Sequence, residues 1–357
     1  MHLAELGRPV ATLPPLLRAG LIGCGYISQQ HIPAWQASPD AELVAVCDSN
    51  RARAEQRAEQ FGIGKVYEDV ETMLASEQLD CVDIATRPET HKPLATLAAE
   101  HGLNVLCQKP LAPTMAEGRE IAAIVAKGGG RFMVLEMWRH VPAIKDLKRH
   151  LDAGLIGPVH SLRLLGHRRP MNREYPVNPD QPYFAEMPKL LIYEMMIHYI
   201  DGVRSLMGDV GHVFARATRV NPLIEGDDHA LVVFGHTSGA HSSIDCSWAS
   251  PADRRPKMGA GDMLLEGRDG SLHLDPFDAE LRHVTLDGTV TVLKSYEGAP
   301  NAYQAAFDSC VGDFAAAVRH GRPFLSPGSD NLKTLAATLA AYESIKKGEV
   351  VDPILTP

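Results

Sequence analysis

The sequence lacks an excess of basic residues and has no long apolar run. Its 357 residues include 44 Asp and Glu against 35 Lys and Arg, which gives a formal net charge of −9. An acidic chain of this kind disfavours nucleic acid as a partner. No run approaches the roughly 20 apolar residues of a membrane span, and the first residues have neither the basic start nor the cleavage site of a signal peptide. We therefore expect a cytoplasmic protein that binds neither membrane nor nucleic acid.

Paired cysteines are also missing. The six cysteines form no C-x-x-C pair, which argues against a zinc ribbon and against a secreted disulfide framework. Cys47, Cys81 and Cys107 lie within apolar runs, and Cys24 follows one. A free thiol in such a place behaves as a small buried hydrophobic group. We expect buried, unreactive thiols and a reducing compartment.

The length allows about two domains at roughly 150 residues each. Over the first third, short apolar runs alternate with helical patterns, as in a parallel sheet with helices on both faces. From residue 157 to 295 the runs alternate with period two, and Asp287-Gly288 between two of them predicts a hairpin. The sequence therefore predicts an α/β protein: a doubly wound parallel sheet in residues 1–137, then an α+β domain with a mostly antiparallel sheet in residues 138–357. Two helical patterns close the chain and could pack back on the first domain.

A glycine-rich turn carries the clearest functional motif. Gly23-Cys24-Gly25-Tyr26-Ile27-Ser28 follows an apolar run and opens a helical pattern, and Asp48 ends the next apolar run 20 residues later. This is the dinucleotide-binding fingerprint with serine at its third position. Gly23 permits the tight turn, Gly25 lets the backbone approach a pyrophosphate, and the helix start around Tyr26 and Ile27 offers free N–H groups to phosphate.

Asp48 bears on the choice of dinucleotide. Its carboxylate accepts hydrogen bonds from ribose hydroxyls and repels a 2′-phosphate, so NAD is predicted in preference to NADP. Arg51 and Arg53 keep NADP possible because either could reach a 2′-phosphate, although both also fit a solvated helix surface.

Further segments resemble the glucose-fructose oxidoreductase / inositol dehydrogenase / MocA (Gfo/Idh/MocA) family. Residues 84–91 (IATRPETH) resemble its T-x-x-x-x-H strand end, residues 105–112 (VLCQKPLA) its E-K-P segment, and residues 194–201 (EMMIHYID) its D-x-G-x-H-x-x-D segment. With the fingerprint and the tail at residues 342–348, the match covers most of the chain in the expected order.

The resemblance implies a fold and a chemistry. It implies an N-terminal Rossmann domain and a C-terminal domain whose large open sheet commonly supports homodimers or homotetramers. It also implies NAD(P)-dependent oxidation or reduction of sugars, polyols and related compounds, usually without a metal. Gln108 replaces the glutamate of E-K-P, and Glu194 and Met196 replace the aspartate and glycine of the third motif. These departures reshape the pocket, so no single relative predicts the substrate.

Lys109 and His198 are the expected catalytic residues. Lys109 follows a predicted parallel strand, at the sheet edge where doubly wound folds bind ligands, and its ammonium can stabilise charge on the reacting oxygen. His198 can exchange the substrate hydroxyl proton because an imidazole titrates near neutral pH. Glu194 and Asp201 would share one helical face with His198 and contact substrate, although Asp201 could instead anchor the helix. Glu194 and His198 could together hold a cation, but without a further His or Cys nearby no metal is expected.

Other residues are expected on the walls of the site. The nicotinamide side of the cofactor should face Thr86, Arg87 and His91, and Gln108 and Lys109 are also expected to bind the cofactor. The substrate wall should include Trp138, Arg139, Arg168, Arg169 and Tyr183, each of which could equally be structural. The adjacent pair Arg168 and Arg169 raises the possibility of an acidic or lactone substrate.

These observations predict an NAD(P)-dependent dehydrogenase that transfers a hydride between a sugar, polyol or related hydroxy compound and nicotinamide. Two alternatives remain open. One is a redox-assisted glycoside hydrolase that binds NAD tightly and regenerates it, and release of NADH distinguishes the two. The other is a non-catalytic sugar- or nucleotide-sensing regulator on the same fold, against which the presence of both Lys109 and His198 argues.

Overall fold

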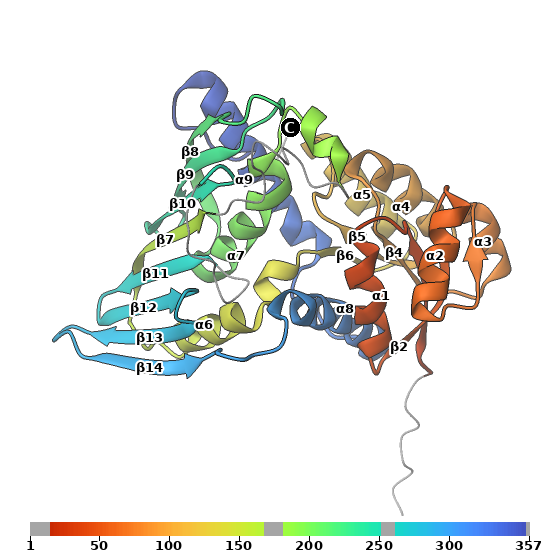
Figure 1. Ribbon diagram of the computed structural model, residues 1–357, viewed down its shortest axis with the longest axis horizontal. Coiled ribbons are helices and arrows are strands. Elements are labelled where there is room, and N and C mark those ends of the chain that lie inside the picture. Colours follow the sequence, from red (N-terminus) through yellow and green to blue (C-terminus); the bar gives the residue numbers. More distant parts are fainter. Residues whose placement is uncertain (1–14, 168–180, 251–260, 355–357) are drawn as a thin grey trace, which may run out of the picture.

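The computed structural model describes residues 15–167, 181–250 and 261–354. Two β-sheets lie side by side with helices packed on and between them (Figure 1). The first sheet is built from residues 17–135 and the second from residues 159–295. The predicted α/β architecture, a doubly wound parallel sheet followed by a mostly antiparallel sheet, is confirmed.

The first sheet is parallel and six-stranded, with the order β3-β2-β1-β4-β5-β6. Its strands are β1 (Leu17–Ile22), β2 (Ala41–Cys47), β3 (Val66–Tyr67), β4 (Cys81–Ile84), β5 (Asn104–Gln108) and β6 (Phe132–Leu135). The order reverses between β1 and β4, which is where doubly wound sheets bind their ligands. The two-residue β3 and the helix after it were not predicted, because so short a strand carries no period.

Both faces of this sheet are buried. In β5, Leu106 belongs to one hydrophobic cluster, whereas Val105 and Cys107 belong to another. Alternate side chains of the strand therefore pack into two different cores, one on each face of the sheet. The covering helices are α1 (Ser28–Ala37), α2 (Arg51–Phe61), α3 (Val70–Ser76), α4 (His91–Glu100) and α5 (Met115–Lys127), with the short η1 (Pro88–Thr90) before α4. Side-chain caps set several starts: Asn50 accepts from the N–H of Arg53, and Thr114 from that of Glu117.

The second sheet has eight strands in the order β14-β13-β12-β11-β7-β10-β9-β8. All neighbouring pairs are antiparallel except β7 with β10. The strands are β7 (Val159–His167), β8 (Val210–Thr218), β9 (His229–His236), β10 (His241–Ser247), β11 (Asp262–Gly267), β12 (Gly270–Asp275), β13 (Glu280–Thr285) and β14 (Val290–Ser295). The predicted hairpin at Asp287-Gly288 is present, and the N–H of Thr285 donates to the Thr289 carbonyl across it at 3.1 Å.

The second group of helices packs on this sheet and reaches back to the first. They are η2 (Met137–His140), α6 (Pro142–Asp152), η3 (Pro182–Glu186), the π-helical η4 (Leu191–Met196), α7 (Ile197–Met207), α8 (Ala302–His320) and α9 (Gly328–Lys347). Helix α8 contacts α1, and α9 contacts both α5 and β8. We retain the proposed boundary after residue 137, because the last strand of the first sheet ends at Leu135 and the next sheet begins at Val159.

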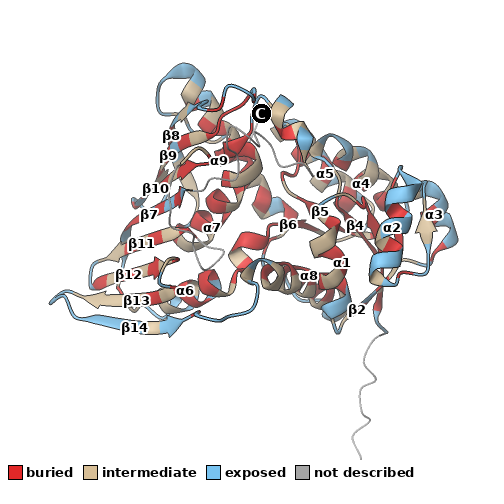
Figure 2. Cartoon of the chain, viewed as in Figure 1, coloured by how far each residue is buried: buried red, intermediate tan, exposed pale blue. Residues whose placement is uncertain are grey.

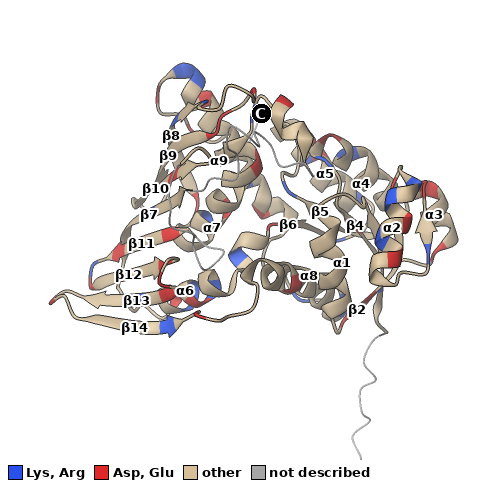
Figure 3. Ribbon diagram, in the orientation of Figure 1, with Lys and Arg blue, Asp and Glu red and all other residues tan. Residues whose placement is uncertain are grey.

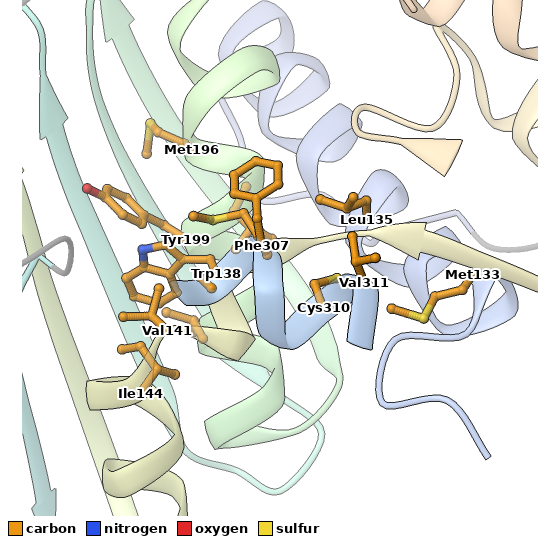
Figure 4. Close-up of a cluster of buried hydrophobic side chains, with 14 of the residues drawn as sticks. Met133, Leu135, Trp138, Val141, Ile144, Met196, Tyr199, Phe307, Cys310 and Val311 are labelled. Carbon is orange, nitrogen blue, oxygen red and sulfur yellow. The ribbon is translucent and has the colours of Figure 1, made fainter. Parts of the chain in front are cut away.

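A buried apolar cluster joins the two parts of the chain. Figure 4 shows Leu135 of β6, Trp138 of η2, Tyr199 of α7 and Phe307 of α8 within it. The Trp138 and Tyr199 rings pack edge to face with centroids 4.9 Å apart. Gly202 permits this packing, since a Cβ there would lie 2.0 Å from the indole of Trp138. Buried residues follow the strands and the inner helix faces, whereas β14 at the edge of the second sheet is largely exposed (Figure 2).

The cysteines are buried, as the sequence predicted. All six thiols are free and buried, and burial raises the pKa of Cys24 and of Cys47 to about 12. Acidic and basic residues are interspersed over both parts of the molecule (Figure 3). Among the described residues no helix is long and apolar enough to cross a membrane.

Candidate active site

A cavity of about 1700 Å³ lies at the carboxyl ends of the parallel strands. The segments that follow β1, β2, β4, β5 and β6 all reach it, and η3, η4, α7 and α8 complete its wall. The cavity therefore extends from the first sheet to the second part of the chain. It is lined by residues of the glycine-rich turn, of the segments after β4 and β5, and of the segment from Glu194 to Tyr199.

The glycine-rich turn forms one end of the cavity. Gly23 has a φ of 103°, and a Cβ there would lie 2.7 Å from the Ala85 carbonyl oxygen, so only glycine fits. A Cβ on Gly25 would meet no protein atom within 4 Å, which leaves room for a pyrophosphate. Tyr26 and Ile27 also line the cavity directly before α1, where free N–H groups and the helix dipole favour phosphate. These residues fit a dinucleotide.

Asp48 lies at the end of β2 with its carboxylate fixed. One oxygen accepts from the N–H of Cys24 and the other from that of Asn50, both at 2.8 Å. The oxygen that accepts from Asn50 retains a second lone pair, so a ribose hydroxyl can still bind there. Arg53 lies 3.5 Å from the same carboxylate and lines the cavity, whereas Arg51 pairs with Glu55 on the helix surface.

In the segment after β4, one residue that was expected to face the cofactor does not reach the cavity. Thr86 and Arg87 line the cavity, but His91 is fully buried behind them. Its two ring nitrogens lie 2.9 Å from the Leu111 carbonyl and 3.1 Å from the Thr86 carbonyl, and burial lowers its pKa. The expectation that His91 faces nicotinamide is therefore not met by its position. It ties the Thr86 turn to the segment after β5.

Lys109 and Glu194 meet in the middle of the cavity. The Lys109 ammonium donates to the Glu194 carboxylate at 2.9 Å and to the Glu194 carbonyl at 2.6 Å. Both side chains are mostly buried, with exposed fractions of 10% and 16%. A cation and an anion held this close in a cleft give a polar substrate both a donor and an acceptor.

His198 completes the group from the first turn of α7. Its ring lines the cavity, and its Nδ1 contacts a carboxylate oxygen of Glu136, the residue directly after β6. Glu136 was not predicted as a site residue, because it lies within an apolar run of the sequence. The rule that selected Lys109, a polar residue following a parallel strand, would have found it.

Asp201 and Arg139 do not reach the cavity. Asp201 is fully buried, accepts from the Arg139 guanidinium and from the Thr334 hydroxyl, and so joins η2 to α9. Glu194 lies in the π-helical turn η4 and Asp201 in α7, so the three motif residues do not share one face. The expected substrate contacts of Arg139 and Asp201 are corrected to a structural ion pair, whereas the alternative of a helix anchor agrees with this geometry.

Comparison with known proteins identifies the family. A model described as "Oxidoreductase family, NAD-binding Rossmann fold" matches residues 17–136, and one described as "GFO/IDH/MocA C-terminal domain" matches residues 144–273. The chain is 36% identical to D-apiose dehydrogenase of Paraburkholderia graminis over 341 residues, which are 94% of this chain and 89% of that protein. The chain belongs to the Gfo/Idh/MocA family.

Other members of the Gfo/Idh/MocA family agree. D-apiose dehydrogenase of Rhizobium rhizogenes is 30% identical over 94% of this chain and 97% of its own length. The crystal structure of an oxidoreductase from Agrobacterium radiobacter in complex with NAD+, L-tartaric acid and magnesium matches with a TM-score of 0.87 and 31% identity, over 95% and 98% of the two chains. The expected family, the Rossmann fold and NAD as cofactor are confirmed, and the chain is an NAD-dependent oxidoreductase.

The structure gives a reason for the glutamine that departs from the family's E-K-P segment. Gln108 accepts from the N–H of Lys109 at 2.6 Å through its oxygen and offers its amide to Nε2 of His31 at 3.0 Å. Nδ1 of His31 lies 2.7 Å from buried Asp83. His31 therefore donates to Asp83 and accepts from Gln108, an arrangement that a carboxylate at position 108 would break.

The substrate wall is more aromatic than expected. Trp138 and Tyr183 line the cavity, and so do residues that the sequence did not single out, namely Phe184, Tyr193, Trp248, Tyr303 and Phe307. Burial, and secondarily the charge of Glu194, raise the pKa of Tyr183 to about 12, so its phenol stays neutral. Tyr303 and Phe307 come from α8, far along the chain, where no local pattern points to the site. Arg168 and Arg169 lie outside the described residues.

Proposed function

We propose that the protein oxidises a hydroxyl-bearing carbon of a small sugar, with Lys109 and His198 handling the oxygen and its proton. The observation that carries the proposal is the convergence of Lys109, Glu194 and His198 in one cavity with the dinucleotide turn. NAD, when bound, accepts the hydride. We infer that NAD is preferred to NADP, because the Asp48 carboxylate faces the same cavity.

Lys109, His198 and Glu194 each have a separate role in the proposed reaction. As a hydride leaves the carbon, the ammonium of Lys109 donates a hydrogen bond to the oxygen and stabilises its developing negative charge. His198 accepts the hydroxyl proton. Glu194 exchanges its bond to Lys109 for one from a neighbouring substrate hydroxyl, which orients the sugar. Loss of one hydride and one proton from the anomeric carbon and hydroxyl of an aldose leaves a lactone.

The substrate class we infer is a small aldose, with apiose as the first candidate. The two curated relatives named above are D-apiose dehydrogenases that this chain covers almost completely. The cavity agrees in its chemistry, because it combines an ammonium, a carboxylate and an imidazole with aromatic walls that can pack against the C–H face of a sugar ring.

The test is an NADH absorbance screen of aldoses, inositols, aldonates and lactones with NAD and with NADP. We expect NAD-dependent turnover of apiose or a related aldose. Lys109→Ala and His198→Ala should each lower kcat by about 10²–10³-fold while NADH still binds, since each removes a group that acts on the reacting oxygen. Near-normal turnover in either variant would overturn that residue's role, and NADH-free consumption of a glycoside would favour the redox-assisted hydrolase.

We also propose that the enzyme works in the cytoplasm as a homodimer or homotetramer through the open face of its second sheet. Leu165 and Leu231 both pair with Asp245 in the strand between them, and both are more than a third exposed. Exposed apolar side chains on one face of a sheet favour burial against a partner surface. Light scattering of wild type and Leu165→Glu tests this proposal.

A further inference from the structure

We propose that Glu136 is a positioning residue for His198: its buried carboxylate holds Nδ1–H of the imidazole and leaves Nε2 as the proton acceptor in the cavity. This inference rests on the proposed function of His198. It assigns a role to a residue that no motif pointed to.

The position of Glu136 follows from the register of the sheet. Gln108 of β5 pairs with Leu135 of β6, so Lys109 and Glu136 each follow the end of adjacent parallel strands. His198 enters from the other part of the chain, at the first turn of α7. The Glu136 carboxylate and the Lys109 ammonium therefore lie at the ends of neighbouring strands of the first sheet. The His198 imidazole comes from α7, in the second part of the chain.

The Glu136 side chain is fully buried. Burying a carboxylate costs desolvation free energy unless a bonded partner compensates for it. Its Oε1 contacts His198 Nδ1, and its Oε2 has no hydrogen-bond partner among the described residues. A buried polar atom left without a partner calls for an explanation. Among the described residues, His198 is the one hydrogen-bond partner of this buried carboxylate, which points to the imidazole as the reason for the buried charge.

The contact fixes the tautomer. An ionised carboxylate is only an acceptor, so Nδ1 must carry the proton and Nε2 keeps its lone pair. No other described side chain hydrogen-bonds to the His198 ring. When Nε2 takes the substrate proton, the imidazolium that forms lies against the Glu136 anion and is stabilised, which is the task of the buried acid in a Ser-His-Asp triad.

Other charged and titratable groups lie near the pair. Lys109 and Glu194 line the same cavity but bond to each other. Cys310 of α8 lies near Glu136, and burial raises the pKa of that thiol so that it stays neutral. The Glu136 carboxylate is thus the anion in direct contact with His198.

Kinetics provides the first arm of the test. Glu136→Gln should lower kcat about ten- to a hundredfold, within the contribution of a general base, and should move the acid limb of the kcat/KM profile down by about one pH unit, because the imidazolium loses its anion. Glu136→Asp should restore part of that shift. Asp146→Asn, which removes another buried carboxylate far from the cavity, should leave the acid limb in place. An unchanged acid limb in Glu136→Gln would overturn the proposal.

Nitrogen NMR of the ¹⁵N-histidine enzyme provides a second arm that needs no substrate. The His198 signals are identified by their loss in His198→Gln. We expect the Nδ1–H tautomer in wild type, and a protonation midpoint at lower pH in Glu136→Gln than in wild type. An Nε2–H tautomer in wild type, or equal midpoints, would contradict the Glu136 pairing. If no sugar is oxidised at all, the proposed function fails while this arm still decides the role of Glu136.

Discussion

At the scale of single residues, we expect the preference for NAD over NADP to depend on one carboxylate and one guanidinium. Asp48 would bind ribose hydroxyls, and Arg53, 3.5 Å away, would pair with a 2′-phosphate once the carboxylate charge is gone. We expect Asp48→Asn to raise kcat/KM for NADP relative to kcat/KM for NAD by about 10- to 100-fold. A factor of this size corresponds to the free energy of one charge-assisted hydrogen bond. Comparing kcat/KM for the two cofactors measures this.

Arg51 supplies the matched control for that prediction. Arg53→Ala in the Asp48→Asn background should reverse the gain in NADP use, whereas Arg51→Ala should not, because Arg51 pairs with Glu55 outside the cavity. Equal effects of the two arginine variants would show that general charge, rather than Arg53, sets the preference.

Single residues of the site were predictable from the sequence where a functional side chain directly follows a parallel strand. Gly23, Gly25 and Asp48 were found from the dinucleotide fingerprint, and Lys109 from its place after a strand together with the family resemblance. All four line the cavity. His91 and Asp201 show the limit of that reasoning. Sequence spacing does not reveal that each side chain turns away to bond with Leu111 or with Arg139.

At the scale of elements, the π-helical turn η4 sets the position of Glu194. Asp227 holds the start of this turn by accepting from the N–H groups of Leu190 and Ile192 at 3.0 and 2.9 Å, and from the Tyr342 hydroxyl at 2.9 Å. The sequence suggested an ordinary helical face from 194 to 201. It carried no sign of the π turn, because the bonds that stabilise it come from residues far along the chain.

Asp227→Ala should therefore disturb both stability and catalysis. The unsatisfied N–H groups should reduce the free energy of unfolding by about 1–3 kcal/mol, and kcat/KM for the sugar should fall several-fold because Glu194 no longer sits against Lys109. Denaturant titration and steady-state kinetics measure the two effects. Asp228→Ala is the control, since buried Asp228 accepts from Val220 and Asn221 instead. An equal loss of kcat/KM in both variants would contradict a specific role for η4.

At the scale of the whole molecule, the core that joins the two parts should make stability depend on pH. Burial, helped by the nearby charge of Arg139, lowers the pKa of His140 from 6.5 to about 4. The unfolded chain therefore binds a proton between pH 6.5 and 4 that the folded protein does not. This contribution to stability is complete above pH 6.5 and is lost as pH falls toward 4, to a total of about 3 kcal/mol.

Denaturant titration from pH 7.5 to 4.5 tests this dependence. His140→Gln should show a shallower loss of unfolding free energy with acid than wild type, whereas His212→Gln, at an exposed ion pair with Asp352, should follow wild type. An acid dependence in His140→Gln as steep as that of wild type would show that other groups cause it.

The overall architecture was the most predictable level. Alternating runs indicated the parallel sheet, and short period-two runs with Asp287-Gly288 indicated the antiparallel one, because each period is a local property of the chain. The contribution of α8 to the cavity wall was not predictable. Tyr303 and Phe307 reach the site only because α8 packs against α1.

The most direct test of the account follows the hydride itself. The enzyme is incubated with NAD and apiose carrying deuterium at its anomeric carbon, and the reduced cofactor and the sugar product are analysed by mass spectrometry and NMR. The account predicts one deuterated NADH for each lactone formed, and almost none in Lys109→Ala. Consumption of the sugar without deuterium in the released cofactor would contradict it.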